Sequence, residues 1–209
     1  MKIFDNDVIL FDGDSITDAL RDRNDEYSLA GYSQVVYEQI STKLPNVKCY
    51  NRGIGGDISA QLNNRILSEL NEIRPTVFSL LIGINDTWRK FDSGITITAE
   101  EYGKNVDEIL TKAKRFTDRI IVIEPFLLDV DPQKKPFRED LYPKICTLRE
   151  VVRGYNVEYV PMDGIYAELC CRNAPDKYSY DGVHPTALGH EIIAKEWLRR
   201  VVFNKRRTK

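Results

Sequence analysis

A short apolar run at residues 8–11 ends directly in the acidic and hydroxylated segment Asp12-Gly13-Asp14-Ser15. Two carboxylates at alternate positions after a strand can serve metal-assisted phosphoryl transfer, with one aspartate as the nucleophile. A serine in the same place can instead attack an ester carbonyl, provided that a base takes its proton. A turn without catalytic function is the third alternative, and the segment alone leaves all three open.

The chain contains two histidines, His184 and His190. His184 lies three residues after Asp181 in the segment DGVHP, and Pro185 keeps it out of α-helical geometry. An aspartate at this spacing can fold back onto the imidazole and fix its tautomer, as a catalytic base requires. The alternative is a capping turn in which Asp181 bonds the backbone and His184 lies at the surface. His190 falls inside a helical segment, where a packing or capping role is expected.

Acyl transfer also needs hydrogen-bond donors for the developing oxyanion. Gly55 and Gly56 follow a β-like run, and no side chain shields their N–H groups. Asn85 follows another apolar run and carries a neutral amide, which does not repel negative charge. Each feature alone has an ordinary alternative, a glycine turn or an asparagine in a turn. Together with Ser15 they supply the parts of an acyl-transfer site from separate strand ends.

These distant positions need a scaffold that brings them together. Apolar or β-branched runs predict strands at residues 8–11, 47–51, 76–83, 119–125 and 157–161. Helical spacing predicts helices at residues 33–44, 59–70, 98–116, 138–155 and 186–202. This alternation predicts an α/β fold with a parallel sheet covered by helices on both faces.

Sites in such sheets form at the carboxyl ends of the strands. The segments that follow the predicted strands are residues 12–15, 52–57, 84–88 and 125–128. We therefore expect these segments to converge in space.

Four sequence blocks resemble the SGNH (GDSL-type) hydrolase family in their order and spacing. The blocks are GDSIT (13–17), NRGIGGD (51–57), GIND (83–86) and DGVHP (181–185). The resemblance spans residues 8 to about 200. It implies a three-layer α/β/α sandwich with a central, mainly five-stranded parallel sheet of the flavodoxin-like SGNH type.

The resemblance also implies a role for each matched residue. Ser15 would be the nucleophile, His184 the base and Asp181 the residue that orients His184. The oxyanion hole would consist of the Ser15 N–H, the Gly56 N–H and the Asn85 side chain. No metal ion and no cofactor is expected.

Three further residues lie near these blocks. Asp14 is expected to bond the turn backbone and support the site. Trp88 is expected to form a wall of the pocket, either by stacking on a sugar ring or by simple packing. Asp12 departs from the family, which more often has a small or apolar residue there, and it receives no role.

The expected activity is that of a serine esterase acting on short-chain esters, acetyl esters of carbohydrates in particular. No long apolar insertion suggests a lipid lid, and a small exposed site beside Trp88 suits an acetyl group on a sugar. The polar segment 127–140 is expected at the rim, as a loop or the start of a helix. Lysophospholipase, thioesterase and aryl esterase activities are the alternatives within the family.

Two alternatives come from other functional classes. A haloacid-dehalogenase-like phosphatase would use Asp12 as nucleophile and Asp14 as acid and base, with Mg²⁺ bridging. It leaves the Asp181–His184 pair without purpose. A non-catalytic glycan-binding module would show a lost triad member, whereas serine, histidine and aspartate are all present.

Composition bounds the remaining expectations. The 209 residues, 42% hydrophobic and 30% charged, suit a single domain over residues 1–203 with a basic, disordered tail at 204–209. A net charge of −2 offers no field that attracts nucleic acid. No segment has transmembrane length and no signal peptide is visible, so a cytoplasmic location without membrane contact is expected. The expected partner is a small-molecule ester such as an acetylated oligosaccharide.

Overall fold

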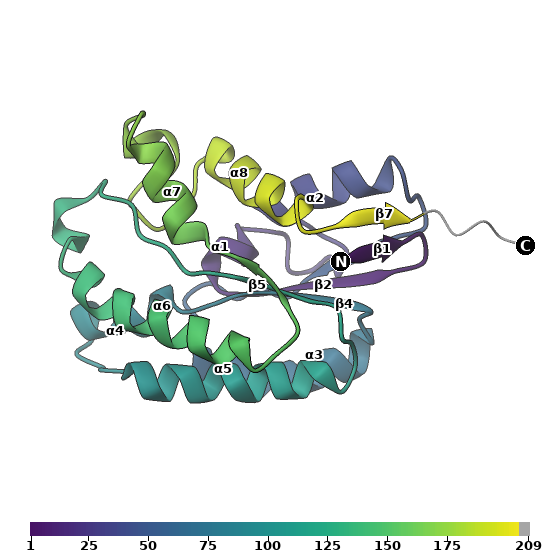
Figure 1. Ribbon diagram of the computed structural model, residues 1–209, viewed down its shortest axis with the longest axis horizontal. Coiled ribbons are helices and arrows are strands. Elements are labelled where there is room, and N and C mark those ends of the chain that lie inside the picture. The colour runs from purple at the N-terminus through teal and green to yellow at the C-terminus, as the bar shows by residue number, and fades with distance from the viewer. Residues whose placement is uncertain (205–209) are drawn as a thin grey trace, which may run out of the picture.

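The computed structural model describes residues 1–204 of the chain, which form three layers (Figure 1). The central layer is a five-stranded parallel sheet with the strand order β3-β2-β4-β5-β6. Its strands are β2 (Val8–Gly13), β3 (Lys48–Asn51), β4 (Val77–Leu81), β5 (Ile120–Ile123) and β6 (Glu158–Val160). A strand was expected in each of these places, and the predicted α/β fold is confirmed.

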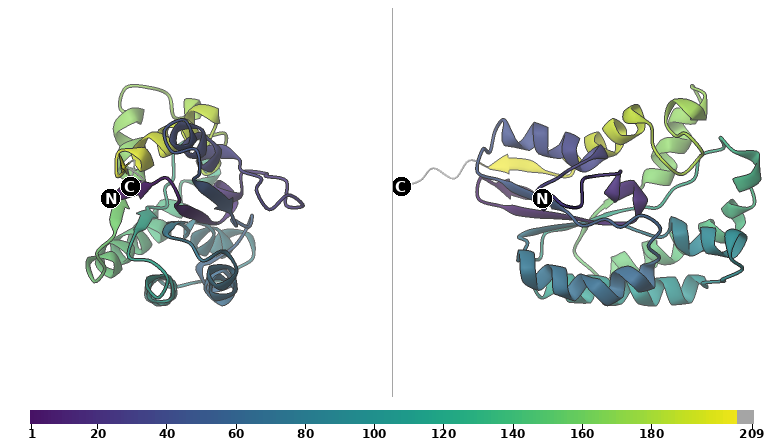
Figure 2. Two further views of the ribbon diagram at one scale, coloured as in Figure 1. Left: turned by 90° about the vertical axis from the view of Figure 1, so that its right-hand side faces the viewer. Right: turned by 180° about the vertical axis from the view of Figure 1, so that it is seen from behind.

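Helices cover both faces of the sheet (Figure 1, Figure 2). One face carries α2 (Gly31–Ser41), α7 (Met162–Cys170) and α8 (Ala187–Leu198), and the other carries α3 (Ser59–Ile73), α5 (Ala99–Lys114) and α6 (Phe137–Arg153). β4 and β5 are buried along their whole length. Strands covered on both faces are expected to be continuously apolar, which explains the unbroken runs in the sequence.

Alternation of side chains along β2 divides the core into two parts. Phe11 points toward α8, where its ring centroid lies 5.7 Å from that of Trp197. Its neighbour Leu10 belongs to the opposite cluster, together with Leu62 and Ile66 of α3. Single residues of one strand therefore anchor the helices of both outer layers.

The α5 helix begins as the sequence predicts. The Thr98 hydroxyl accepts a hydrogen bond from the Glu101 N–H at 3.1 Å, and the Glu101 carboxylate accepts one from the Thr98 N–H at 2.8 Å. This reciprocal pair satisfies two backbone donors that have no partner inside the helix. The pair is a capping box, and the Thr98-x-x-Glu101 pattern that forms it is a local feature of the sequence.

Several short elements were not predicted. The α4 helix (Ile84–Asp92) begins directly after β4, α7 follows β6, and β1 (Lys2–Phe4) pairs in parallel with β7 (Val202–Asn204). The predicted final helix ends at Leu198 instead of continuing to residue 202. β1 and β7 have three residues each, and α4 and α7 have nine each, so these elements show few repeats of a periodic pattern in the sequence.

The expected disordered tail at residues 204–209 is wrong at its first residue. Asn204, the first residue of the expected basic tail, belongs to β7, while residues 205–209 lie outside the described part of the chain. Within residues 1–204, no helix combines the length and the apolar character needed to cross a membrane.

The strand order determines where a site can form. The chain passes from β3 on one side of β2 to β4 on its other side. This is a topological switch point, where the loops after neighbouring strands diverge and leave a crevice. The serine, glycine and asparagine segments follow β2, β3 and β4 and therefore meet at this end of the sheet.

Candidate active site

Ser15, His184 and Asp181 form one continuous line of hydrogen bonds. The Ser15 Oγ lies 3.1 Å from the His184 Nε2, and the His184 Nδ1 lies 3.0 Å from the Asp181 Oδ2. The structure thus brings together three side chains that come from opposite ends of the chain. This order of hydroxyl, imidazole and carboxylate can activate the serine as a nucleophile.

Ser15 is the first residue of the short α1 helix (Ser15–Asp18), immediately after β2. The Asp14 Oδ1 caps this helix by accepting a hydrogen bond from the Ile16 N–H at 3.0 Å. Gly13 has φ +154°, and a Cβ there would lie 1.9 Å from the Leu81 carbonyl oxygen. A glycine is therefore required for β2 to approach β4 so closely just before the serine.

The Asp181 carboxylate both caps a turn and holds the imidazole. Its Oδ1 accepts hydrogen bonds from the Val183 N–H at 3.0 Å and the His184 N–H at 2.7 Å. Its Oδ2 faces the His184 ring. The two interpretations of this pair, a capping turn and a histidine orienter, are therefore both realised by different oxygens of one carboxylate.

The Asp181 contact selects the tautomer of His184. Because a carboxylate accepts hydrogen bonds, the proton of the neutral imidazole lies on Nδ1, and Nε2 can accept the Ser15 hydroxyl proton. The hydrogen bond to Asp181 raises the pKa of His184 above its usual value, against the effect of partial burial. Partial burial of Asp181 acts to raise its pKa. The hydrogen bonds from His184 and Val183 outweigh this effect and hold the pKa of Asp181 well below its usual range.

Three candidate oxyanion donors face this end of the sheet. Among the described residues, no hydrogen bond engages the Ser15 N–H or the Gly56 N–H. Asn85 lies in the first turn of α4, and its amide donates to the Asp57 carbonyl oxygen at 3.1 Å, which leaves a second N–H for a ligand. Gly55 differs, because its N–H donates to the Asp18 carboxylate at 3.2 Å. Of the two candidate glycines, Gly56 is therefore the one with a free donor.

Asp12, which the sequence analysis left without a role, is completely buried and forms an ion pair with Arg65. The Asp12 Oδ1 lies 2.9 Å from an Arg65 guanidinium nitrogen. The same guanidinium donates to the Gly13 carbonyl oxygen at 3.1 Å and to the Asp57 carboxylate at 2.8 Å. Arg65 of α3 therefore links the segment before Ser15 to the segment that contains Gly55 and Gly56. Arg65 also pairs at 2.8 Å with Glu69, four residues along the same helix, but its other partners lie outside α3 and have no local pattern in the sequence.

Asp14 is also completely buried, and its Oδ2 has no hydrogen-bond partner among the described residues. Burial raises the pKa of Asp14 to about 7, although the Ile16 N–H opposes this change. The expected role in supporting the turn agrees with its hydrogen bond to Ile16.

Trp88 stands beside the imidazole, where the sequence placed a wall residue. Its ring centroid lies 5.9 Å from that of His184 and 5.7 Å from that of Phe137. The contact with Phe137 is the packing role that the sequence analysis considered.

His190 does not join the hydrogen-bonded line of the site. Its Nδ1 accepts the Tyr32 N–H at 3.1 Å in the first turn of α2, and burial lowers its pKa to about 4.

A groove of about 630 Å³ opens beside the serine. Its lining includes Ser15, Gly55, Tyr180, His184 and His190. The segment 127–140 borders the site from another side, because Lys134 lies 3.2 Å from the Asp181 Oδ2. Lys134 is a second residue that the sequence analysis did not single out, and it belongs to the short 3-10 helix η1 (Pro132–Lys134).

Comparisons with known proteins agree with the resemblance of the four blocks. A sequence model of the GDSL-like Lipase/Acylhydrolase family matches residues 11–192. An acetylxylan esterase of Geobacillus stearothermophilus is 28% identical over 214 residues, which cover 97% of this chain and 97% of that protein.

Solved structures show the same likeness. A serine-to-alanine catalytic mutant of Axe2, an acetylxylan esterase from G. stearothermophilus, aligns with a TM-score of 0.87 and 26% identity over 98% of each chain. LAE5, an α/β hydrolase from the metagenome of Lake Arreo, aligns with a TM-score of 0.84 over 93% of this chain and 94% of its own. LAE5 is 24% identical, and its likeness shows the shared fold.

Proposed function

The chain belongs to the GDSL-like lipase/acylhydrolase family, and on this premise we propose that it is a serine esterase that removes acetyl groups from carbohydrates. The single observation that carries the proposed chemistry is the hydrogen-bonded line from Ser15 through His184 to Asp181. The acetylxylan esterase relatives support the choice of acyl group and substrate class.

The proposed reaction has two halves. In the first, the Ser15 Oγ attacks the ester carbonyl while the His184 Nε2 accepts its proton, and the imidazolium then protonates the departing sugar oxygen. In the second, His184 takes a proton from water, which attacks the acetyl-serine, and then returns that proton to the Ser15 Oγ as acetate leaves. Asp181 holds the ring orientation and stabilises the imidazolium in both halves.

The proposed oxyanion hole consists of the Ser15 N–H, the Gly56 N–H and the Asn85 amide. These donors are held before the substrate arrives, because Asp57 binds the Asn85 amide and Asp14 caps the Ser15 helix. Preorganised donors need no reorganisation as charge develops on the carbonyl oxygen, which makes them effective.

The groove beside Ser15 suits the alcohol portion of the substrate. Its rim bears exposed Leu20 and Tyr180, whose apolar surfaces can contact the face of a sugar ring. Carboxylates of Glu38 and Glu191 also line it and can accept hydrogen bonds from sugar hydroxyls. Acetylated neutral oligosaccharides therefore fit better than lysophospholipids, thioesters or aryl esters, the other substrates of this family.

The geometry gives no support to the two rival classes. The proposed phosphatase nucleophile Asp12 has no exposed surface and is paired with Arg65, so its carboxylate cannot reach a phosphate. A glycan-binding module would not need Ser15, His184 and Asp181 aligned within hydrogen-bond distance.

The proposal is tested by measuring ester hydrolysis over two substrate series. One series consists of p-nitrophenyl esters of increasing acyl length, and the other of acetylated and deacetylated xylo-oligosaccharides. We expect acetate release from the acetylated sugars and a decline in kcat/KM beyond short acyl chains. A preference for acyl chains of eight carbons or more would reject the acetyl assignment.

Ser15→Ala serves as the matched control in these assays. We expect it to lower kcat by at least about 10⁴-fold, because the other groups cannot replace the nucleophile. A folded Ser15→Ala protein with activity near that of the wild type would reject the serine mechanism altogether. EDTA is expected to leave the wild-type rate unchanged, whereas a magnesium-dependent phosphatase would lose its activity.

A further inference from the structure

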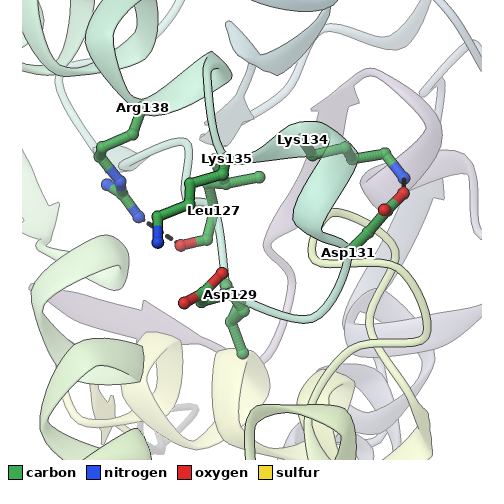
Figure 3. A pocket seen from close by; sticks show the side chains of 7 residues that line it. Leu127, Asp129, Asp131, Lys134, Lys135 and Arg138 are labelled. Carbon is green, nitrogen blue, oxygen red and sulfur yellow. Dashed lines mark hydrogen bonds and ion pairs between the residues drawn. The ribbon is translucent and has the colours of Figure 1, made fainter.

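Lys134 reaches the candidate triad from a segment that is remote from all four sequence blocks. It ends the η1 helix, between the loop after β5 and the start of α6. Figure 3 shows this segment around a cavity of about 170 Å³, with the Lys134 side chain pointing toward Asp131. The Lys134 side chain is 12% exposed, which is unusual for a lysine without a specific partner.

Three groups surround the Lys134 ammonium. Its Nζ lies 3.2 Å from the Asp181 Oδ2 and 3.0 Å from the Asp131 Oδ2. It also lies 4.9 Å from the centroid of the Trp88 ring, a cation–π distance. Trp88 in turn contacts the His184 ring. The ammonium is thus held by two carboxylates and one aromatic face. One of the carboxylates is Asp181 of the triad, and the aromatic ring contacts His184.

The Asp181 Oδ2 is shared between Lys134 and His184. It lies 3.2 Å from the lysine Nζ and 3.0 Å from the imidazole Nδ1. The Asp181 Oδ1 is already occupied by two backbone N–H groups. Lys134 therefore completes the set of donors that fixes the Asp181 carboxylate in one orientation.

We propose that Lys134 is a positioning residue of the triad, which holds the Asp181 carboxylate in place and opposes the accumulation of positive charge on His184. This inference rests on the proposed serine esterase function. Lys134 touches no reacting atom, and it acts through Asp181 and through its electric field.

The charged and titratable groups around His184 determine the sign of this effect. Asp181 on the same loop and the ionised form of Asp14 after β2 favour the imidazolium, whereas Lys134 on η1 disfavours it. His190 on α8 lines the same groove as His184, and burial lowers the pKa of His190 to about 4, which keeps it neutral near pH 7. Removal of the Lys134 charge should therefore raise the pKa of His184 and move the acidic limb of the pH–rate profile to higher pH.

A substitution at Asp131 should shift the acidic limb of the pH–rate profile in the opposite direction. Its Oδ1 accepts the Gln133 N–H at 2.9 Å and caps η1, a bond that an asparagine can also make. Asp131→Asn removes a negative charge beside Lys134 and leaves the ammonium free to interact with Asp181 more strongly. The acidic limb should therefore move to lower pH in this variant.

The experiment compares Asp131→Asn and four further variants of the full chain with p-nitrophenyl acetate as substrate, over a range of pH. Lys134→Met removes the charge and keeps the chain length, and Lys134→Arg restores the charge. Lys135→Met is the matched control, because Lys135 is exposed and forms no ion pair with a described residue. Ser15→Ala measures the rate without the nucleophile. Circular dichroism and thermal unfolding establish that each variant is folded.

We expect Lys134→Met to lower kcat/KM on the plateau by roughly 3- to 30-fold, which lies within the range of interaction energies for residues in direct contact. Its acidic limb should move to higher pH, that of Lys134→Arg should stay closer to wild type, and Lys135→Met should match wild type. If Lys134→Met fails to fold, Asp131→Asn alone decides, through a shift of the limb to lower pH.

Two distinct failures can be separated. If wild type and Ser15→Ala hydrolyse the ester equally, the proposed esterase function is wrong. If wild type is active and Ser15→Ala is not, but Lys134→Met matches Lys135→Met in rate and in acidic limb, the positioning role of Lys134 is overturned. An unshifted limb in a folded Asp131→Asn protein also counts against it.

Discussion

The Arg65 guanidinium lies 2.9 Å from the carboxylate of Asp12, a residue with no exposed surface. Burial raises the pKa of Asp12, and Arg65 opposes this change by stabilising the ionised form. The same guanidinium also binds the Gly13 carbonyl oxygen and the Asp57 carboxylate. The pair therefore supports the backbone on both sides of the candidate oxyanion hole.

Loss of Arg65 should destabilise the protein strongly. Arg65→Met leaves the buried Asp12 without a counterion, and breaking a buried ion pair costs about 3 to 5 kcal/mol. Urea unfolding monitored by circular dichroism measures this change in the free energy of unfolding.

A control for Arg65 is available on the neighbouring surface. Arg52 pairs at 2.9 Å with Glu72, whose side chain is 61% exposed. Arg52→Met should therefore cost no more than about 1 kcal/mol. The double variant Asp12→Asn/Arg65→Met should recover part of the lost stability, and equal losses in Arg65→Met and Arg52→Met would contradict the structural role of the buried pair.

Asn85→Ala should impair the chemical step without unfolding the chain. Removal of one oxyanion donor lowers kcat by about 100- to 1,000-fold, because the transition state loses a hydrogen bond that the ground state makes only weakly. Steady-state kinetics with p-nitrophenyl acetate measure this loss. A KM increase with unchanged kcat would instead assign Asn85 to substrate binding.

The rate should depend on the ionisation of His184. The hydrogen bond to Asp181 raises the pKa of His184 above its ordinary value of 6.5, and the proposed base must be neutral. We expect kcat/KM to be low at acidic pH and to rise to a plateau as the pH increases, with a midpoint above 6.5. Initial rates in buffers of constant ionic strength test this, and a rate that stays constant down to acidic pH would exclude His184 as the base.

Asp14 should make the folded state less stable as the pH rises. Its pKa is raised from 3.8 to about 7 by burial, so between these values the folded protein binds more protons than the unfolded chain. The free energy of unfolding therefore falls with increasing pH in this window. Asp14→Asn keeps a side-chain oxygen for the Ile16 N–H and removes this dependence. Above pH 7 it should be more stable than wild type by about 2 to 4 kcal/mol.

Urea unfolding at pH 4 and pH 8 measures the Asp14 effect as a difference between variant and wild type. Asp118→Asn is the control, because the Asp118 side chain is 91% exposed and its change should be small at both values. A stability difference for Asp14→Asn that does not grow with pH would show that Asp14 is ionised throughout.

Much of the fold and the composition of the candidate site follow from local sequence. Buried parallel strands need continuous apolar runs, and the capping box of α5 lies within four consecutive residues, so both are readable without a structure. The strand-end rule then predicts that the segments after β2, β3 and β4 meet, as they do. The catalytic roles of Ser15, Asp181 and His184 stay predictions until the variants are measured.

Tertiary structure decided what depends on contacts between separate elements. Asp12 obtained its partner from α3, the Gly55 N–H was engaged by the Asp18 carboxylate of α1, and Lys134 reached Asp181 from η1. These are long-range pairings of polar groups, which have no periodic signature in the sequence. Their geometry exists only after the apolar faces of the helices have packed on the sheet and set the distances between the loops.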